Sequence, residues 1–251
     1  MTALSYQLYS SRMFPPLEDT LRMLADIGYA HVEGYSALLD DADGVAALER
    51  GLGDTGLTMP SCHVGLEKCE SNPDAVVAVA KRFGIETIVI PYIMPDDRPT
   101  DANGWTGFGA RLAAVSAALA PTGLALAYHN HDFEFVATSD GSLPIDLILA
   151  EAPGVRFEYD VAWAVRAGAD PFAPIGTYGS RIALAHLKDI APEGEATDED
   201  GWADVGHGTM DWSALFAALK SAGTTQFIAE HDKPSDHRRF AQRAFDTVAK
   251  Y

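Results

Sequence analysis

The sequence is poor in cysteine and in positive charge. Of its 251 residues, two are cysteine and 18 are lysine or arginine, against 36 aspartate or glutamate, so the formal net charge is −18. Because nucleic-acid binding depends mainly on lysine and arginine neutralising phosphates, this balance predicts no nucleic-acid partner. Cys62 and Cys69 give neither a disulfide framework nor the paired spacing of a structural zinc site, which fits a reducing cytoplasm.

Long apolar runs and composition breaks are also missing. The first residues hold no cationic segment followed by an apolar stretch, and no run reaches the ~20 apolar residues that span a bilayer. We therefore predict no membrane association and a cytoplasmic location. No linker rich in proline, glycine or serine and no low-complexity tract divides the chain, so we expect residues 1–251 to form a single domain.

What the sequence does contain is a repeated alternation of short β-like runs and segments with helical periodicity, many of which end in glycine. Eight alternations predict an α/β fold, a closed parallel (β/α)8 TIM barrel. The alternative of an open doubly wound sheet is disfavoured, because no strand is followed by G-x-G-x-x-G. The predicted strands cover residues 4–9, 31–34, 58–64, 87–92, 124–131, 155–160, 182–189 and 226–232.

Histidines and carboxylates gather at the carboxyl ends of these strands, the end where barrel enzymes place their chemistry. In residues 124–131 the bulky Leu126 and Tyr128 share one face, while Ala127, His129 and His131 share the other, which would face the barrel interior. The same alternation points further polar side chains inward: Gln7, Glu33, Glu158, Asp160, His186, Lys188, Glu230 and Asp232. For Glu158 we expect an ion pair with Arg156 at the barrel floor rather than a catalytic role.

Asp160, His186 and Glu230 end the last three strands, which are neighbours in a barrel. Mixed carboxylate and imidazole groups at one edge are suited to hold a divalent cation. A fourth ligand is expected from the preceding strand, where the sequence YHNHDFEF offers three candidates: His129, His131 and Glu134.

The order of several motifs along the chain gives a resemblance that no single motif would give. The motifs are QLYS, YHNHDFEF, EYDVAWAVRAGADP, AHLKD, GHGTMDW and AEHD. Together, over roughly residues 4–249, they resemble the sugar phosphate isomerase/epimerase family with its xylose isomerase-like barrel. Within it, the chain is most similar to the branch of inosose dehydratase-like and 3-keto-glycoside-processing enzymes.

The resemblance implies one divalent metal ion, manganese, magnesium, cobalt or zinc, held by two glutamates, an aspartate and a histidine. Asp160, His186 and Glu230 match three of these ligands, and we predict Glu134 as the fourth, with His129 as the alternative. Two positions depart from the family. Trp163 stands where epimerase-like members carry histidine, and residues 206–208 read Gly-His-Gly where many read Gly-Glu-Gly.

The chemistry these groups would perform is enolisation, in which a metal polarises a sugar carbonyl and a side chain removes the proton beside it. Candidate bases are His129, His131, Glu134 and Glu230. Reprotonation gives isomerisation or epimerisation, and loss of a β-substituent gives dehydration or glycoside elimination. Lys188 is placed to bind a sugar hydroxyl or steady the enediolate, with a salt bridge to Asp189 or Glu158 as the structural alternative.

Four further residues are candidates for substrate binding, each with a structural alternative. His63 would line the pocket or pack at a strand end, and Trp163 would stack on a sugar ring or pack internally. Arg166 would bind a carboxylate or phosphate, or remain solvated. His207 lies in a loop whose N–H groups would meet an anion, unless it is a plain loop. The acidic segment 191–209 is expected to be a solvated loop, with a mobile cover as the alternative.

The sequence thus favours a metal-dependent isomerase or epimerase, or a lyase, acting on a small sugar or keto-sugar. A barrel that only binds sugars, or serves as a partner subunit, is the non-catalytic alternative. Phosphodiester hydrolysis of the apurinic-endonuclease type is disfavoured by the acidic balance. The alanine-rich outer helix over 110–120 would also suit contact with a second subunit, so a homo-oligomer is possible.

Overall fold

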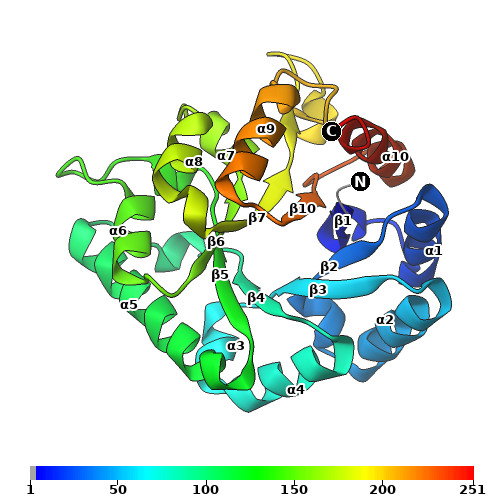
Figure 1. Ribbon diagram of the computed structural model, residues 1–251, viewed down its shortest axis with the longest axis horizontal. Coiled ribbons are helices and arrows are strands. Elements are labelled where there is room, and N and C mark those ends of the chain that lie inside the picture. Colours follow the sequence, from blue (N-terminus) through cyan, green and yellow to red (C-terminus); the bar gives the residue numbers. More distant parts are fainter. Residues whose placement is uncertain (1–3) are drawn as a thin grey trace.

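Eight parallel strands close into a barrel in the computed structural model, which describes residues 4–251 (Figure 1). Chain order is kept around the barrel, and a small antiparallel hairpin of β8 and β9 follows β7. The predicted (β/α)8 barrel is confirmed. The barrel strands are β1 (Leu4–Gln7), β2 (His31–Tyr35), β3 (Thr58–His63), β4 (Thr87–Ile90), β5 (Ala125–His129), β6 (Arg156–Asp160), β7 (Ile182–Leu187) and β10 (Gln226–Ala229); the hairpin strands are β8 (Asp189–Ile190) and β9 (Trp202–Ala203).

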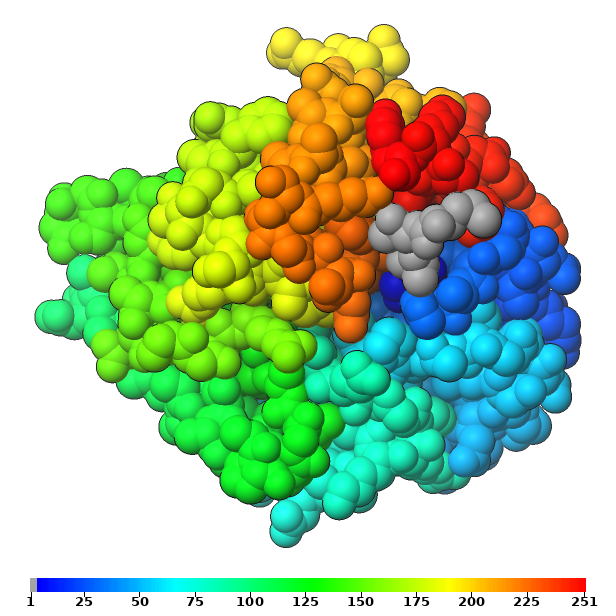
Figure 2. All heavy atoms as spheres, viewed as in Figure 1, coloured from blue at the N-terminus to red at the C-terminus, as the bar shows by residue number. Residues whose placement is uncertain are grey.

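Helices connect the strands and form the outer layer, from α1 and α2 (blue) round to α10 (red) in Figure 2. In α4 the Asn72 side chain accepts the Ala75 N–H, Pro73 takes the first helical position, and Gly84 ends the helix at φ 70°. The helices are α1 (Leu17–Ile27), α2 (Ala42–Thr55), α3 (Leu66–Ser71), α4 (Pro73–Phe83), α5 (Ala102–Leu119), α6 (Pro144–Glu151), α7 (Val161–Arg166), α8 (Phe172–Tyr178), α9 (Trp212–Ala222) and α10 (His237–Val248).

The two faces of the strands separate the outer core from the barrel interior. Tyr128 packs outward against Phe108 of α5, with the ring centroids 5.6 Å apart, as the alternation in β5 predicts. Inside the barrel, side chains of β4, β5, β7 and β10 form a small apolar cluster of Val89, Ala127, Leu184 and Ile228. Two residues further along β5, β7 and β10 the inward positions are polar: His129, His186 and Glu230. The apolar cluster therefore closes the barrel below a polar site at its carboxyl end.

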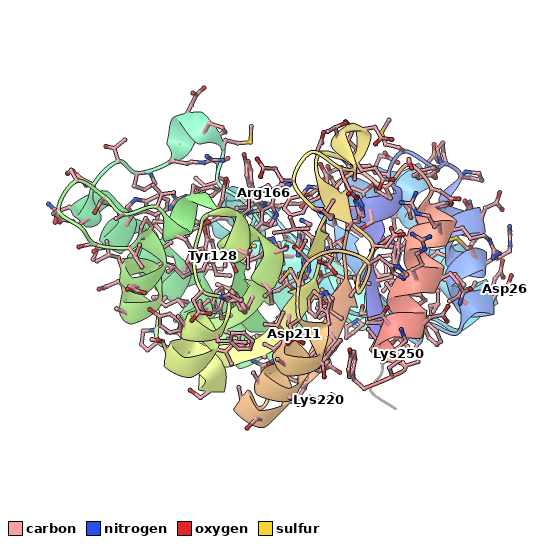
Figure 3. All side chains as sticks on the ribbon, turned by 90° about the horizontal axis from the view of Figure 1, so that it is seen from above. Asp26, Tyr128, Arg166, Asp211, Lys220 and Lys250 are labelled. Atoms are coloured by element: carbon pink, nitrogen blue, oxygen red, sulfur yellow. The ribbon has the colours of Figure 1, made fainter. Side chains whose placement is uncertain are left out.

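The side view in Figure 3 separates the two ends of the barrel. Arg166, at the end of α7 directly after β6, lies at the end where the strands finish, and Lys220 lies toward the other end. Within residues 4–251 no helix is both long and apolar enough to cross a membrane.

Candidate active site and metal-binding groups

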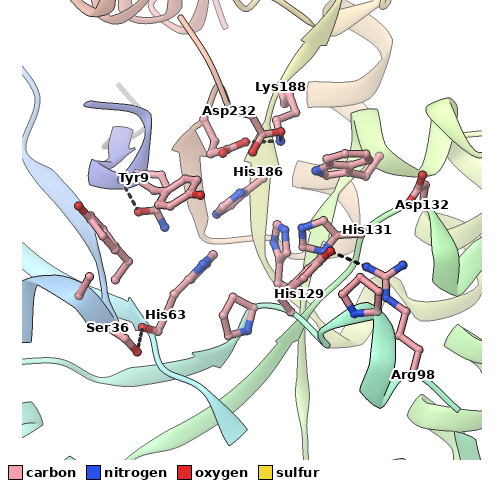
Figure 4. Close-up of a pocket in the computed structure, with 18 of the residues that line it drawn as sticks. Tyr9, Ser36, His63, Arg98, His129, His131, Asp132, His186, Lys188 and Asp232 are labelled. Atoms are coloured by element: carbon pink, nitrogen blue, oxygen red, sulfur yellow. Dashed lines mark hydrogen bonds and ion pairs between the residues drawn. The ribbon is translucent and has the colours of Figure 1, made fainter. Parts of the chain in front are cut away.

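A cavity of about 890 Å³ opens at the carboxyl end of the barrel strands (Figure 4). Its wall is built from the ends of the strands and the residues that follow them, because all eight strands point the same way. Seven of the side chains predicted from sequence line it: His63, His129, His131, Trp163, His186, Lys188 and Glu230. The structure therefore brings most of the predicted site together in one place.

Three of the four predicted metal ligands, Asp160, His186 and Glu230, form what we call the upper group. One candidate ligand atom from each lies within 4.8 Å of the others, and all three side chains are buried. Asp160 ends β6 and caps α7, because its Oδ1 accepts the Trp163 N–H at 3.0 Å. Its Oδ2 lies 3.9 Å from His186 Nδ1. Register explains the approach, because Asp160 pairs directly with His186 across β6 and β7.

Lys188 lies against the upper group as a buried ammonium. Its Nζ is 2.5 Å from Glu230, 2.7 Å from Asp232 and 3.5 Å from Asp160. Although burial opposes the charge, these carboxylates hold the pKa of Lys188 above its usual value. The pairing predicted as an alternative, with Asp189 or Glu158, is wrong. With the three carboxylates ionised and His186 neutral, as it is when it binds a metal ion, the ammonium offsets one negative charge and leaves two.

Below the upper group lies a second cluster, the deep group, which consists of Glu33, His63, His129, Glu158 and His186. Glu158 Oε2 is 2.8 Å from His63 Nε2, 3.1 Å from His129 Nδ1 and 3.2 Å from His186 Nε2. Glu33 Oε1 lies 2.7 Å from the same His186 nitrogen and 3.2 Å from that of His63. The predicted ion pair between Arg156 and Glu158 is absent among the described residues, because Arg156 begins β6 in an exposed position.

The electrostatics of the deep group divide its histidines. Burial opposes protonation of His63 and His186, but Glu33 and Glu158 raise their pKa to about 10 and about 9. Burial, and then the neighbouring His186, lower the pKa of His129 well below its usual value. Two protonated rings and one neutral ring therefore face the two carboxylates when no metal ion is bound.

Glu134, predicted as the fourth metal ligand and a candidate base, does not join either group. Its Oε1 accepts the Tyr128 hydroxyl at 2.5 Å and its Oε2 accepts the His131 N–H at 2.8 Å. Burial raises the pKa of Glu134 to about 7. The short helical turn Phe133–Phe135 folds the side chain back beneath the loop after β5, away from the cavity wall. Glu134 therefore supports this turn, and His129 is the β5 residue that reaches the site.

Two predicted substrate-binding residues also lie outside the cavity wall. Arg166 donates to the Asp200 carbonyl at 2.7 Å and stacks on Trp202, 3.3 Å from the ring centroid. His207 is exposed. The N–H groups beside His207 do bind an anion, but it is the chain's own Asp189, whose Oδ2 accepts those of Gly206 and Gly208 at 2.9 and 3.2 Å. The expected contacts with a substrate anion are thus replaced by an internal one.

The acidic segment 191–209 is docked on the barrel. Trp202 is 1% exposed and meets Trp163 edge to face, with ring centroids 4.8 Å apart. Lys188 Nζ lies 4.6 and 4.9 Å from the Trp202 and Trp163 ring centroids, so the two indoles cover the ammonium. Arg239 of α10 holds the segment through Glu199 at 2.8 Å and Asp204 at 2.8 Å. The expectation of a solvated loop is therefore wrong for the residues that are buried, which are Ala191, Glu199, Trp202, Asp204 and Val205.

This anchor predicts an acid-sensitive contribution to stability. Burial opposes ionisation of Glu199, but hydrogen bonds from Ser235 and Arg239 lower its pKa to about 2. Because this folded-state pKa lies below the unfolded value, ionised Glu199 stabilises the fold above ~pH 4.5, and the contribution is lost as the pH falls toward ~2. In thermal denaturation, Glu199→Gln is expected to lose less stability than wild type over that range. Glu193→Gln, an exposed change in the same segment, is the control; wild-type behaviour in both variants would contradict the assignment.

The rim of the cavity was missed by sequence reasoning. It includes Tyr9, Tyr35, Tyr92, Arg98 and Asp132. Tyr9 and Tyr35 meet edge to face, and the Arg98 guanidinium donates to the Tyr92 hydroxyl at 2.5 Å. Tyr9 and Tyr92 end predicted strands and Tyr35 directly follows one, so their position at strand ends could have identified them as rim residues. Arg98 and Asp132 lie in loops, where no periodicity indicates direction.

The family model described as xylose isomerase-like TIM barrel matches residues 21–248. The rhizopine catabolism protein MocC of Rhizobium meliloti is 25% identical over 162 residues, which are 58% of this chain and 49% of that protein. The chain therefore spans about half the length of the curated relative that it matches.

Solved structures share the fold over almost the whole chain. A sugar phosphate isomerase/epimerase from Parabacteroides distasonis ATCC 8503 has a TM-score of 0.81 at 18% identity, with 98% of this chain and 92% of that chain covered. The IOLI protein with a bound zinc atom gives 0.75 at 17%, with coverage of 99% and 96%. The 3-keto-D-glucoside 4-epimerase YcjR from E. coli gives 0.71 at 15%, with coverage of 100% and 99%.

At these identities the solved structures establish the fold alone. The family model, by contrast, spans the barrel from within α1 to the end of α10. The resemblance read from the sequence motifs is confirmed by this match, and the chain belongs to the xylose isomerase-like TIM barrel family.

Proposed function

We propose that this protein is a divalent-metal-dependent isomerase or epimerase, or a lyase, that acts on a sugar or keto-sugar. The observation that carries the proposal is the upper group at the floor of the cavity. Within residues 4–251, Asp160 Oδ2 and His186 Nδ1 are buried without a hydrogen-bond partner, and Glu230 lies beside them. Buried atoms of these types suit a cation, and the only ion-pair partners of Asp160 Oδ2 among the described residues are Lys188 at 3.5 Å and His186 at 3.9 Å. When bound, a divalent ion would polarise a sugar carbonyl and acidify the adjacent C–H bond.

Three protein ligands, Asp160, His186 and Glu230, fit such an ion and leave coordination positions for substrate, as catalytic sites require. The two negative charges that Lys188 leaves unbalanced also match a divalent ion. Among proteins of the same fold, the zinc bound to the IOLI protein supports a metal in this barrel.

His131 is the residue that we assign as the general base. Burial and the nearby Lys188 lower the pKa of His131 to about 3, which keeps its ring neutral at neutral pH. A base this weak would depend on the bound metal ion to acidify the C–H bond beside the carbonyl. Its Nδ1 has no hydrogen-bond partner in the described part of the chain, and its ring lines the cavity (Figure 4). His129 is also neutral, but its Nδ1 is directed at Glu158. The geometry therefore favours His131 for proton removal.

Lys188 and Trp163 are assigned to positioning. Lys188 holds Glu230 and Asp232 through direct ion pairs, which fixes the carboxylate that we propose as a metal ligand. Trp163 lines the cavity, and its Nε1–H has no acceptor within residues 4–251. That N–H is buried, so we assign only the indole face to the substrate, as a surface for a sugar ring.

The charges of the cavity favour a neutral substrate. Asp40, Asp132, Glu230 and Asp232 line it, and the lysine and arginine that line it already have partners. Lys188 pairs with Glu230 and Asp232, and Arg98 at the rim donates to Tyr92 and to the Ile93 carbonyl. Neither cation is left free for a phosphate group, which disfavours a phosphorylated sugar. The keto-sugar substrate in the name of YcjR is consistent with an unphosphorylated substrate of this class. The cytoplasmic location and the possible homo-oligomer remain predictions from the sequence.

The test is solvent exchange at a sugar carbon. Protein loaded with manganese, in deuterated water, is incubated with ketoses, inososes and 3-keto-glycosides, and NMR follows label and product. We expect deuterium at a carbon beside the carbonyl of at least one compound, loss of that exchange after chelation, and its return with added manganese. Tight binding of a sugar without exchange would instead favour a binding protein and contradict the proposed catalysis.

A further inference from the structure

We infer that the deep group is a second cation site, of the four-coordinate type that zinc and cobalt prefer, formed by His63, His129, His186 and Glu158. One ligand atom from each of these four residues lies within 4.8 Å of the others. Glu158 Oε2 is 2.8, 3.1 and 3.2 Å from the three imidazole nitrogens. Ligands about 2.0–2.1 Å from a tetrahedral zinc ion are separated by roughly 3.3 Å, so these spacings approach those of a closed coordination shell.

The second oxygen atoms of the two carboxylates beside this point are unpaired. Glu158 Oε1 and Glu33 Oε2 are fully buried and have no hydrogen-bond partner in the part of the chain that the structure describes. Glu33 is held from the opposite side by Gln7, whose Nε2 donates to its Oε1 at 2.9 Å. Without a metal ion, protonated His63 and His186 balance the two buried carboxylates. A divalent ion among neutral imidazoles would supply the same two charges and release two protons.

The deep group is distinct from the upper group in ligand type. Three imidazoles and one carboxylate suit zinc or cobalt, whereas the oxygen-rich upper group suits manganese or magnesium. His186 faces both groups, with Nε2 toward Glu158 and Nδ1 toward Asp160. Lys188 pairs with carboxylates of the upper region, and no ion pair of Lys188 with Glu33 or Glu158 is present among residues 4–251.

An ion can reach this position from solvent. The rings of His63, His129 and His186 line the floor of the cavity, as Figure 4 shows, and the His63 side chain retains 12% exposure. Glu158 and Glu33 lie behind these rings, fully buried. An ion in the deep group would fix the His186 ring, and with it the geometry of the upper group, in the way that second-shell groups orient metal ligands.

Cobalt spectroscopy tests the inference without relying on enzyme activity. Metal-free wild-type protein is titrated with Co²⁺, and separately with Zn²⁺ followed by elemental analysis. We expect the intense visible absorption of four-coordinate cobalt with nitrogen ligands, which an oxygen-rich six-coordinate site does not give. His63→Asn and Glu158→Gln should each remove this absorption and lower bound zinc by about one ion per chain. The exposed His207→Asn is the matched control and should retain both.

A variant of the upper group separates this inference from the proposed function. Glu230→Gln should keep the cobalt absorption, because Glu230 is not a ligand of the deep group, even if it abolishes sugar exchange. If cobalt-loaded wild-type protein shows only the weak visible absorption of six-coordinate cobalt, the inference is overturned. This measurement does not depend on whether a variant folds. Absorption that survives in folded His63→Asn and Glu158→Gln, or that is lost in Glu230→Gln only, would also overturn it.

Discussion

Replacing His186 by asparagine is expected to lower metal-dependent deuterium exchange at the sugar carbon by roughly a thousandfold, about 4 kcal/mol in barrier height. His186 is the one residue shared by both groups, with its Nδ1 toward Asp160 and its Nε2 toward Glu158. Asparagine cannot present two ring nitrogens in opposite directions, so both groups lose a ligand at once. The measurement is the initial rate of label incorporation by NMR at saturating manganese.

His207→Asn is the control for this change, because it removes an exposed histidine outside the cavity wall. Its exchange rate and metal content should match those of wild type. Circular dichroism would show whether His186→Asn keeps its fold, since the change leaves Glu158 and Glu33 with one donor fewer. A folded variant that exchanged deuterium within about tenfold of wild type would remove His186 from the proposed mechanism.

Replacing Lys188 by methionine is expected to lower the free energy of unfolding by roughly 3–5 kcal/mol near neutral pH, because breaking a buried ion pair leaves uncompensated charge. The variant would leave Asp160, Glu230 and Asp232 without their ammonium. Burial, and then Asp232, raise the pKa of Glu230 to about 7. Protonation of these carboxylates would relieve the repulsion, so the deficit should shrink as the pH falls below ~7. Urea denaturation at several pH values measures this.

Manganese should partly restore the stability of Lys188→Met, since a divalent ion bound by the upper group replaces the missing positive charge. Lys81→Met, at an exposed position on α4, is the matched control and should be nearly as stable as wild type at every pH. A Lys188→Met protein as stable as wild type at neutral pH would contradict the assignment of a charged, buried lysine.

The site residues at the ends of the strands could be predicted, because the carboxyl ends of parallel strands lie at the same end of the barrel. Period-two alternation alone placed Asp160, His186 and Glu230 on inward positions of adjacent strands, and the structure brings their ligand atoms within 4.8 Å. The prediction that Glu134 is a metal ligand was wrong for a local reason. It follows β5 in a turn, where alternation no longer gives direction, and the Tyr128 hydroxyl and His131 N–H offered closer partners than the cavity.

The same limit explains the loops. Residues 206–208 have the backbone N–H groups expected of an anion site. Their acceptor is Asp189, which lies 17 residues before Gly206 and 19 before Gly208 in the sequence. The composition of the acidic segment predicts a solvated loop because composition does not reveal ion-pair partners. Glu199 and Asp204 pair with Arg239 of α10. Long-range pairs of this kind depend on which surfaces the barrel brings together.

Periodicity and turn chemistry are local properties, and from them the barrel, the glycine ends of its helices and the inward set of histidines and carboxylates could be predicted. How that set divides into two groups depends on the folded barrel. Closure of the barrel places Lys188 among three carboxylates at one level and directs His63, His129 and His186 onto Glu158 at another. Distances between side chains from five strands depend on barrel closure and register, which no single stretch of sequence contains.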